Sequence, residues 1–346
     1  MNRVIKHKDD TQPNRYKQKL KISLKSFFPD PLIGIVSGYC LTKTIDTIDS
    51  IINVHAKGKL LLYETDKIIL YGYVLLLIDL SKGTAILRRH PAITEKFTIY
   101  HKCAVLSPTN SQQIIIGSSD GMVRYWDLYT NEIVKTIQAH SNFITDLIIL
   151  PDQRLVSSSY DCTLKIWNLK TDCCDMVLNS HGGFISKLSV FIQDADTYFV
   201  VGCGSMCVIE IWNPLTGECT GTFRKSKGIF HSMCVIDKYI GYTSSESNIL
   251  QIFDPGENKL ICCEEDVNQH KNLIRCVGTF EDKIITGSND STIKIWNISV
   301  NDNDEAEVEC EFTLNHDKNE HVMDFCCSEY GRIISITNMG KLYVWG

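Results

Sequence analysis

The stretch DQRLVSSSYDCTLKIWNL, residues 152–169, decides the fold of this chain. Two runs of alternating apolar and polar residues flank a short turn at residues 160–162. Alternation with a period of two places Leu164 and Ile166 on one face of a strand, which a helix would not do. The stretch is therefore predicted to form a β-hairpin whose second strand ends in tryptophan.

The same pattern recurs elsewhere in the chain. Residues 114–127 (IIIGSSDGMVRYWD) and 283–297 (KIITGSNDSTIKIWN) keep the serine, the aspartate and the tryptophan at the same offsets. Self-similarity with a period near 40 residues is typical of propeller blades. Third strands are predicted to end at seven positions, 41 to 49 residues apart: Asp79, Asp127, Asn168, Asn213, Asp254, Asn297 and Gly346.

Tryptophan precedes five of these seven positions, as Trp126, Trp167, Trp212, Trp296 and Trp345. On these residues the chain resembles the WD-repeat β-propellers over about residues 41–346. The resemblance implies blades of four antiparallel strands, in which the named dipeptide closes the third strand. The expected fold is all-β, a seven-bladed WD-repeat β-propeller. An N-terminal strand at residues 40–45 is expected to complete the last blade and close the ring.

Charge divides the chain into two parts. Residues 1–26 hold eight Lys and Arg but two acidic side chains, although the whole chain has a net charge of −6. We expect residues 1–26 to be a flexible basic arm and residues 27–346 to form a single propeller. The arm is interpreted as a solubilising tail, with contact to nucleic acid or anionic lipid as the alternative.

The expected location is intracellular, either cytoplasmic or nuclear. The first ten residues are charged and lack the apolar segment of a secretory signal. The chain has 15 cysteines, an odd number that favours reduced thiols. The most hydrophobic run, residues 68–80, is shorter than a membrane-spanning helix.

Histidine, serine and aspartate occur together in a way that could suggest a hydrolase. The set recurs three times, however, and a nucleophilic triad needs only one site. The family resemblance instead implies buried hydrogen-bond chains that run from a turn aspartate through histidine and a hydroxyl to the indole N–H. We therefore predict structural roles and no enzymatic activity for His90, Ser118, Asp120 and Trp126; for His140, Ser159, Asp161 and Trp167; and for His270, Ser288, Asp290 and Trp296.

No cofactor, metal ion or small-molecule substrate is expected. The chain has no Cys-x-x-Cys pair, and Cys203 and Cys207 have no nearby histidine with which to bind zinc. It also has no glycine-rich loop that ends in Lys-Ser or Lys-Thr, the motif that holds nucleotide phosphates.

Partners are expected on the narrow face of the propeller, where the family resemblance places the connections between blades and the middle hairpin turns. Packing of the aromatic rings between blades is the alternative for the phenylalanines. The acidic segment 301–311 should lie on the opposite face, as a solvated insertion or as a docking site for a basic partner. The residues predicted to bind partners are Asn142, Phe143, Tyr160, Phe184, Phe230, Asn272 and Glu320.

The predicted function is a non-catalytic WD-repeat scaffold that mediates protein–protein interactions, as a monomer within a multiprotein complex. The alternative is a substrate-recognition subunit of a ubiquitin ligase that reaches its adaptor through residues 1–40. Loop residues carry the function of such a fold, and the fold does not dictate their chemistry.

Overall fold

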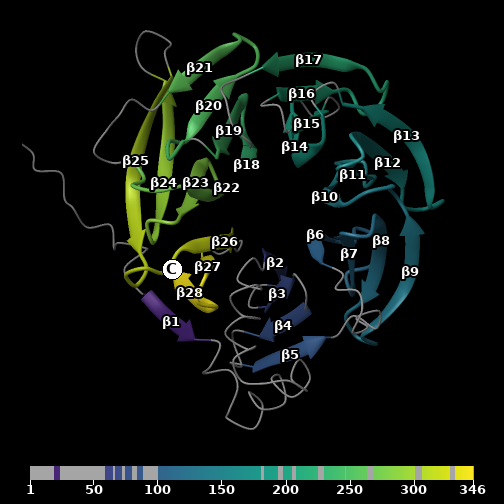
Figure 1. Cartoon of the computed structure of the whole chain (residues 1–346), viewed down its shortest axis with the longest axis horizontal. Coiled ribbons are helices and arrows are strands. Elements are labelled where there is room, and N and C mark those ends of the chain that lie inside the picture. The colour runs from purple at the N-terminus through teal and green to yellow at the C-terminus, as the bar shows by residue number, and fades with distance from the viewer. Residues whose placement is uncertain are drawn as a thin grey trace, which may run out of the picture.

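The structure is a computed structural model, and it confirms the all-β propeller (Figure 1). Every element in the described part of the chain is a strand. The described residues are 19–23, 59–64, 67–71, 75–79, 84–88, 100–180, 183–193, 198–204, 208–224, 230–245, 247–262, 269–300, 306–327 and 332–345.

Six blades each consist of four consecutive antiparallel strands, ordered from the centre of the ring to its rim (Figure 1). Blade 1 contains β2 (Lys59–Glu64), β3 (Lys67–Tyr71), β4 (Leu75–Asp79) and β5 (Thr84–Arg88); blade 2 contains β6 (His101–Leu106), β7 (Gln113–Ser118), β8 (Met122–Asp127) and β9 (Glu132–Gln138); blade 3 contains β10 (Ile144–Ile149), β11 (Leu155–Ser159), β12 (Thr163–Asn168) and β13 (Cys173–Asn179). Blade 4 contains β14 (Ile185–Ile192), β15 (Tyr198–Gly204), β16 (Val208–Trp212) and β17 (Cys219–Arg224); blade 5 contains β18 (Phe230–Ile236), β19 (Tyr239–Ser244), β20 (Gln251–Asp254) and β21 (Lys259–Cys262); blade 6 contains β22 (Ile274–Phe280), β23 (Lys283–Ser288), β24 (Thr292–Val300) and β25 (Ala306–Asn315).

A further four-stranded sheet, called here the composite sheet, combines segments far apart in the sequence. It contains β26 (Val322–Cys327), β27 (Ile333–Thr337), β28 (Lys341–Trp345) and, at its outer edge, β1 (Lys19–Ser23). β1 pairs antiparallel with β28, and Lys19 lies opposite Trp345. The sequence placed residues 19–23 in the flexible arm and assigned this edge to residues 40–45, which lie outside the described residues. In the structure, β1 forms this edge of the sheet.

The acidic segment predicted as an insertion is partly strand. From Ala306 onward it belongs to β25, which pairs with an extended β24 as far as Val300. Glu311 Oε2 lies 2.5 Å from Lys283 Nζ, so one of its carboxylates pairs within the same sheet. Residues 301–305 lie outside the described residues.

The hydrophobic core lies between neighbouring blades. One cluster joins Val156 and Ile166 of blade 3 to Ile185 and Trp212 of blade 4, and corresponding clusters join the other neighbours from blade 1 to the composite sheet. Both faces of an inner sheet are therefore buried, which explains why apolar residues dominate the inner strands.

Two glycines allow neighbouring blades to approach closely. A Cβ atom at Gly117 would lie 2.6 Å from Ile144 Cγ2 in the next blade, and one at Gly287 would lie 2.7 Å from Val322 Cγ1. Both glycines occupy the same position in their second strands, β7 and β23. A larger residue there would push the adjacent inner strand outward.

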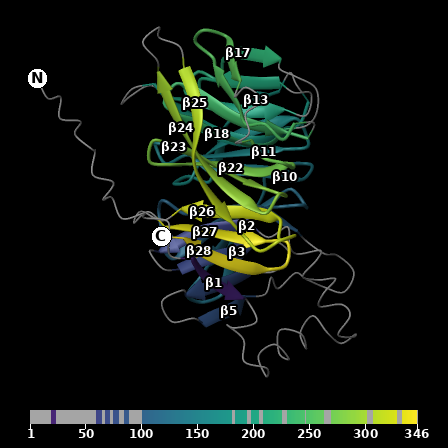
Figure 2. The same ribbon diagram turned by 90° about the vertical axis from the view of Figure 1, so that its left-hand side faces the viewer.

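Side chains of the inner strands also donate or accept hydrogen bonds across blade boundaries. Asp146 Oδ2 accepts a bond from Leu188 N (3.0 Å), and Asp324 Oδ2 accepts one from Leu60 N (2.8 Å). The second bond joins the composite sheet to blade 1, where β26 packs against β2 (Figure 2). Burial raises the pKa of Asp324, although the charge of Lys59 opposes this shift.

The first prediction concerns Gly287. Gly287→Ala should lower the free energy of unfolding by about 1–3 kcal/mol, because the methyl group overlaps Cys276 and Val322. Urea unfolding followed by tryptophan fluorescence measures the change. Gly256→Ala is the matched control, since the nearest atom to its added Cβ is a side-chain oxygen at 3.3 Å. Equal stability of the two variants would contradict this explanation of the blade spacing.

Candidate protein-interaction surface

A chain of hydrogen bonds crosses blade 6 from the surface to its core. His270 Nδ1 donates to Asp290 Oδ2 (2.9 Å), and His270 Nε2 lies 2.7 Å from Thr286 Oγ1. The same Thr286 oxygen accepts a bond from Trp296 Nε1 (2.7 Å). The indole N–H is thus satisfied inside the core, which avoids the cost of an unpaired buried donor.

Blade 3 repeats this chain with a serine in place of the threonine. His140 Nδ1 lies 2.9 Å from Asp161 Oδ2, and His140 Nε2 lies 2.7 Å from Ser157 Oγ. Trp167 Nε1 donates to Ser157 Oγ (2.9 Å). The composite sheet keeps the inner part of the chain, in which Ser335 Oγ contacts His316 Nε2 and Trp345 Nε1.

The hydroxyls named from the sequence, Ser159 and Ser288, are not part of these chains. Each donates instead to a loop carbonyl, Ser159 to Asn142 O (3.2 Å) and Ser288 to Asn272 O (2.9 Å). Trp167 pairs with Leu155 across the sheet, so Ser157 is two residues from that pair and Ser159 is four. Successive same-face residues are about 7 Å apart in a strand. Ser159 therefore lies about 7 Å farther from the indole than Ser157 does, and it cannot reach the indole N–H.

Blade 2 differs from the prediction. His90 lies outside the described residues. Ser118 Oγ contacts His101 Nδ1 (3.0 Å), and Asp120 forms a salt bridge with Arg124. Trp126 is fully buried, but Ile116 occupies the position of the bridging hydroxyl.

The ionisation states of these groups suit a structural role. Burial lowers the pKa of His270 despite the nearby carboxylate, so the ring is neutral at pH 7 and donates one N–H. Burial opposes a low pKa at Asp290, but hydrogen bonds from His270 and Thr292 outweigh it and lower that pKa. The pKa values of His140 and Asp161 are lowered in the same way.

One face of the ring is defined by a repeated backbone hydrogen bond between a turn and a loop. Tyr160 N donates to Phe143 O, and Asn289 N donates to Leu273 O, each at 2.9 Å. The same bond joins the turn and loop of the composite sheet, from Asn338 N to His321 O (2.9 Å). The turn residue and the loop residue are thus held side by side in these three sheets, and we call this surface of the ring the loop face.

Aromatic rings gather on the loop face at blades 3 and 4. Tyr160 contacts Phe143 with ring centroids 5.7 Å apart and Phe184 with centroids 4.3 Å apart. Lys102 Nζ lies 5.4 Å from the centroid of the Tyr160 ring. Phe143 remains 46% exposed. These four residues form what we call the aromatic patch.

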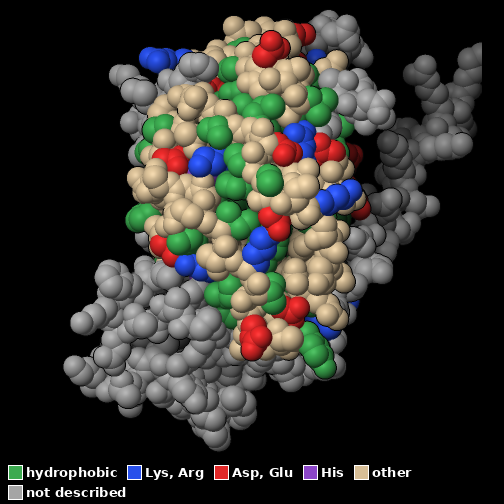
Figure 3. Space-filling model, turned by 90° about the vertical axis from the view of Figure 1, so that its right-hand side faces the viewer, with side chains coloured by type: hydrophobic (Ala, Val, Ile, Leu, Met, Phe, Trp, Pro, Cys, Tyr) green, Lys and Arg blue, Asp and Glu red, His purple; other side chains and the backbone are tan. Residues whose placement is uncertain are grey.

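Apolar side chains elsewhere on the surface are more scattered. Figure 3 shows one side of the rim, on which apolar, acidic and basic side chains are interspersed. Tyr129 and Leu215 are 81% and 61% exposed, and they lie in turns that follow the third strands of their blades. Single exposed apolar residues are normal for soluble proteins, whereas a group of rings in mutual contact marks a potential interface.

Two residues predicted to bind partners are buried instead. Phe230 is 2% exposed and packs its ring 5.0 Å from that of Tyr242. It begins β18 at the position that Ile144 occupies in blade 3, one residue beyond the loop position of Phe143. The prediction for Phe230 was therefore wrong by one residue of register.

Glu320 is likewise part of the interior. It is 4% exposed, accepts a hydrogen bond from Tyr343 Oη (2.5 Å) and forms a salt bridge with Lys341. Its carboxylate is therefore engaged within the composite sheet. Of the other predicted residues, Asn142 and Asn272 are exposed on the loop face. Each side-chain oxygen accepts the N–H of the following residue.

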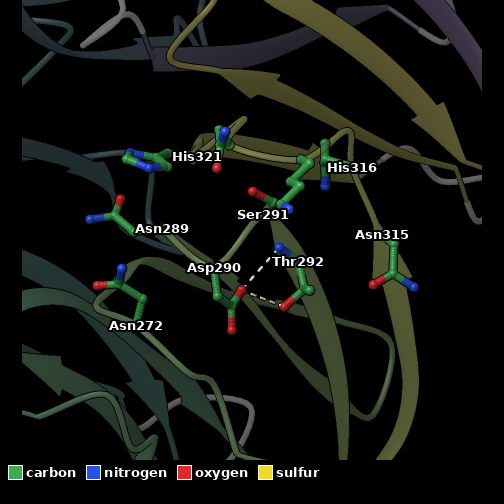
Figure 4. Close-up of a pocket in the computed structure, with 10 residues that line it drawn as sticks. Asn272, Asn289, Asp290, Ser291, Thr292, Asn315, His316 and His321 are labelled. Carbon is green, nitrogen blue, oxygen red and sulfur yellow. Dashed lines mark hydrogen bonds between the residues drawn. The ribbon is translucent and has the colours of Figure 1, made fainter.

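A polar pocket of about 380 Å³ lies on the loop face between blade 6 and the composite sheet (Figure 4). Turn residues of blade 6 and residues 315–321 surround it, and among the described residues no apolar side chain lines it. Lys318 was not predicted from the sequence as a site residue, because its only signal was a position in the loop before the last blade.

These features define the class of protein: the chain is a β-propeller that contains WD repeats. Residues 131–168 and 261–297 match the family model described as WD domain, G-beta repeat. Proteins of this class are generally non-catalytic, in agreement with the structural use of the histidine and aspartate side chains in blades 3 and 6.

Two curated proteins are similar to part of this chain, and both are named "p21-activated protein kinase-interacting protein 1-like". The protein from Gallus gallus is 27% identical over 192 residues, which cover 54% of this chain and 50% of that protein. The protein from Danio rerio is 24% identical over 194 residues, which cover 55% of this chain and 50% of that protein. The chain thus spans about half the length of each relative.

Within the described residues, no helix has the length and apolar character needed to cross a membrane. Those same residues bring together no group of three or more His, Cys, Asp or Glu side chains that could hold a metal ion.

The second prediction tests the bridging hydroxyl. Thr286→Val should lower the free energy of unfolding by about 1–3 kcal/mol, because His270 and Trp296 both lose their partner while the side-chain volume is kept. Thermal unfolding measures the effect. Thr279→Val, an exposed position in β22, is the control. If Ser288→Ala destabilised the protein more than Thr286→Val, the hydroxyl named from the sequence would be the important one.

Proposed function

We propose that this protein is a non-catalytic scaffold that binds protein partners through the aromatic patch on its loop face. The observation that carries the proposal is Phe143, which is 46% exposed although its ring belongs to a group of three. An isolated propeller gains nothing from leaving that ring in water. A partner that covers it would bury apolar area worth about 25 cal/mol per Å².

The composition of the patch suits a binding hot spot. Aromatic rings supply large contact area with few rotatable bonds, and hot spots are enriched in such residues. Lys102 adds a positive charge beside Tyr160, so an acidic residue of a partner could pair with it at the edge of the apolar contact. Tyr160 is held on both sides by Phe143 and Phe184, which supports a preformed surface.

A p21-activated protein kinase is the first partner to test. This choice rests on the names of the two curated relatives, which describe proteins that interact with such a kinase. The relatives match about half of the chain. Phe143 and Tyr160 lie in the family-model repeat at residues 131–168.

The third prediction concerns Phe143. Phe143→Ser should weaken binding of a purified p21-activated kinase at least about tenfold, because truncation of a hot-spot aromatic typically costs 2 kcal/mol or more. Surface plasmon resonance with the full chain measures the affinity. Tyr129→Ser removes a more exposed ring from a turn away from the loop face and should leave binding unchanged.

The controls separate folding from binding. Phe143 is half exposed, so Phe143→Ser should keep the cooperative thermal transition of the wild type. Unchanged affinity of a folded Phe143→Ser variant would contradict the aromatic patch as the site. Wild-type protein that binds no p21-activated kinase would remove that kinase as the partner.

The finer points of the sequence analysis stay predictions. The ubiquitin-ligase alternative depends on residues 1–40, of which the structure describes residues 19–23. Nucleic-acid contact by the basic arm, an intracellular location and a monomer within a complex likewise remain untested predictions.

We also propose that β1 closes a seven-bladed ring by acting as the outer strand of the composite sheet. β28 would otherwise present an open edge, and unpaired strand edges promote aggregation. The pairing of residues 19–23 with β28 supports this role. The hydrogen bond from Leu60 N to Asp324 Oδ2 separately joins blade 1 to β26 of the composite sheet.

The fourth prediction tests this closure. The double variant Leu20→Pro/Lys21→Pro should lower the free energy of unfolding by at least about 1 kcal/mol, because adjacent strand residues point their N–H groups to opposite sides and one of the two must face β28. Leu41→Pro/Thr42→Pro is the matched control in the segment 40–45. Destabilisation by the second pair alone, measured by thermal unfolding, would restore the closure predicted from the sequence.

A further inference from the structure

The polar pocket between blade 6 and the composite sheet has a lining that differs from the aromatic patch. Three separate segments form it: the loop that holds Asn272, the turn that holds Asn289, and the loop that holds Lys318 and His321. Figure 4 shows Asn272, Asn289 and His321 together on one side of the pocket. The chemistry that these groups offer decides which ligand the pocket can take.

Hydrogen bonds fix the orientation of both asparagine amides. The oxygen of Asn272 accepts from Leu273 N (2.7 Å), and the oxygen of Asn289 accepts from Arg275 Nε (3.0 Å). Because both partners are donors, the atoms that face them must be the amide oxygens. Each amide therefore has its NH₂ group left to donate to a ligand.

The loop that holds Lys318 and His321 contributes basic groups. Lys318 is exposed and His321 is half-buried, and both line the pocket. His321 is held in place because its N–H donates to Asn338 Oδ1 (2.8 Å) and its carbonyl accepts from Asn338 N (2.9 Å). The imidazole thus projects from a backbone that is fixed to the neighbouring turn.

The acidic residue of the pocket already has hydrogen-bond donors on both oxygens. Asp290 Oδ2 accepts from His270 Nδ1 (2.9 Å) and Lys271 N (2.8 Å), and Asp290 Oδ1 accepts from Thr292 N (3.0 Å) and Thr292 Oγ1 (2.6 Å). Figure 4 shows this carboxylate directed toward Thr292. These donors stabilise its charge within blade 6.

We propose that this pocket binds an oxyanion, either a phosphoryl group or a side-chain carboxylate, carried by a protein partner. Two asparagines with free NH₂ groups, a lysine and a histidine line a space of about 380 Å³, which can hold a phosphate-sized group and its flanking residues. The proposal rests on the proposed function of the loop face, and it adds a second contact to the aromatic patch. One face would thus recognise an apolar side chain at blades 3 and 4 and an anionic group beside blade 6.

The fifth prediction tests the pocket with inorganic anions in place of a partner. Sodium phosphate, titrated into the full chain at pH 7 and constant ionic strength, should shift the His321 ring resonance in a saturable way. His321→Gln identifies that resonance in the NMR spectrum. Lys318→Ala should weaken phosphate binding about tenfold, because it removes a charge-assisted hydrogen bond. Lys259→Ala, an exposed lysine at the start of β21, is the matched control and should leave binding unchanged.

A parallel titration with sodium acetate distinguishes the two sources of the oxyanion. A saturable response to phosphate alone assigns the pocket to phosphoryl groups. A saturable response to acetate alone assigns it to carboxylates, and a saturable response to both salts assigns it to both groups. A non-saturating response to both salts, or equal phosphate affinity of Lys318→Ala and the wild type, overturns the proposal. Because no partner protein is used, this result is independent of kinase binding by the aromatic patch.

Discussion

The close approach of neighbouring inner strands is the constraint on which the rest of the structure depends. Gly117 and Gly287 leave room for the first strand of the next blade, where a methyl group would overlap its side chains. Asp146 and Asp324 supply acceptors at two other boundaries, for the backbone N–H groups of Leu188 in blade 4 and Leu60 in blade 1. Because an unpaired buried N–H is costly, these two bonds orient neighbouring blades, while the two glycines allow tight packing.

This framework leaves the loop face free to vary in chemistry. The same bond from turn N–H to loop carbonyl recurs in blades 3 and 6, where it joins Tyr160 to Phe143 and Asn289 to Leu273. One backbone geometry thus presents aromatic rings at one blade and a carboxamide at another. The fold fixes where a partner can bind, and the individual loop residues fix what it can be.

Site residues were harder to predict than strands, for specific physical reasons. Ser157 and Ser159 share one face of β11, so alternation could not show which hydroxyl reaches the indole of Trp167, and the repeated serine was the wrong choice. Phe230 was assigned to a loop because its exact position in β18 depends on pairing with β19. Glu320 is polar and follows a loop, and only its contact with Tyr343 shows that it is buried.

The sequence by itself determined the class of fold, since the period of about 40 residues and the alternation within each repeat specify propeller blades and the ends of strands such as β8 and β12. The resemblance to the WD-repeat family supplied the number of strands in each blade. Only the tertiary structure decided which strand lies at the edge of β28, which hydroxyl links histidine to tryptophan, and which rings stay exposed. These features depend on register and on contacts between residues far apart in the chain. Local periodicity carries no information about either of them.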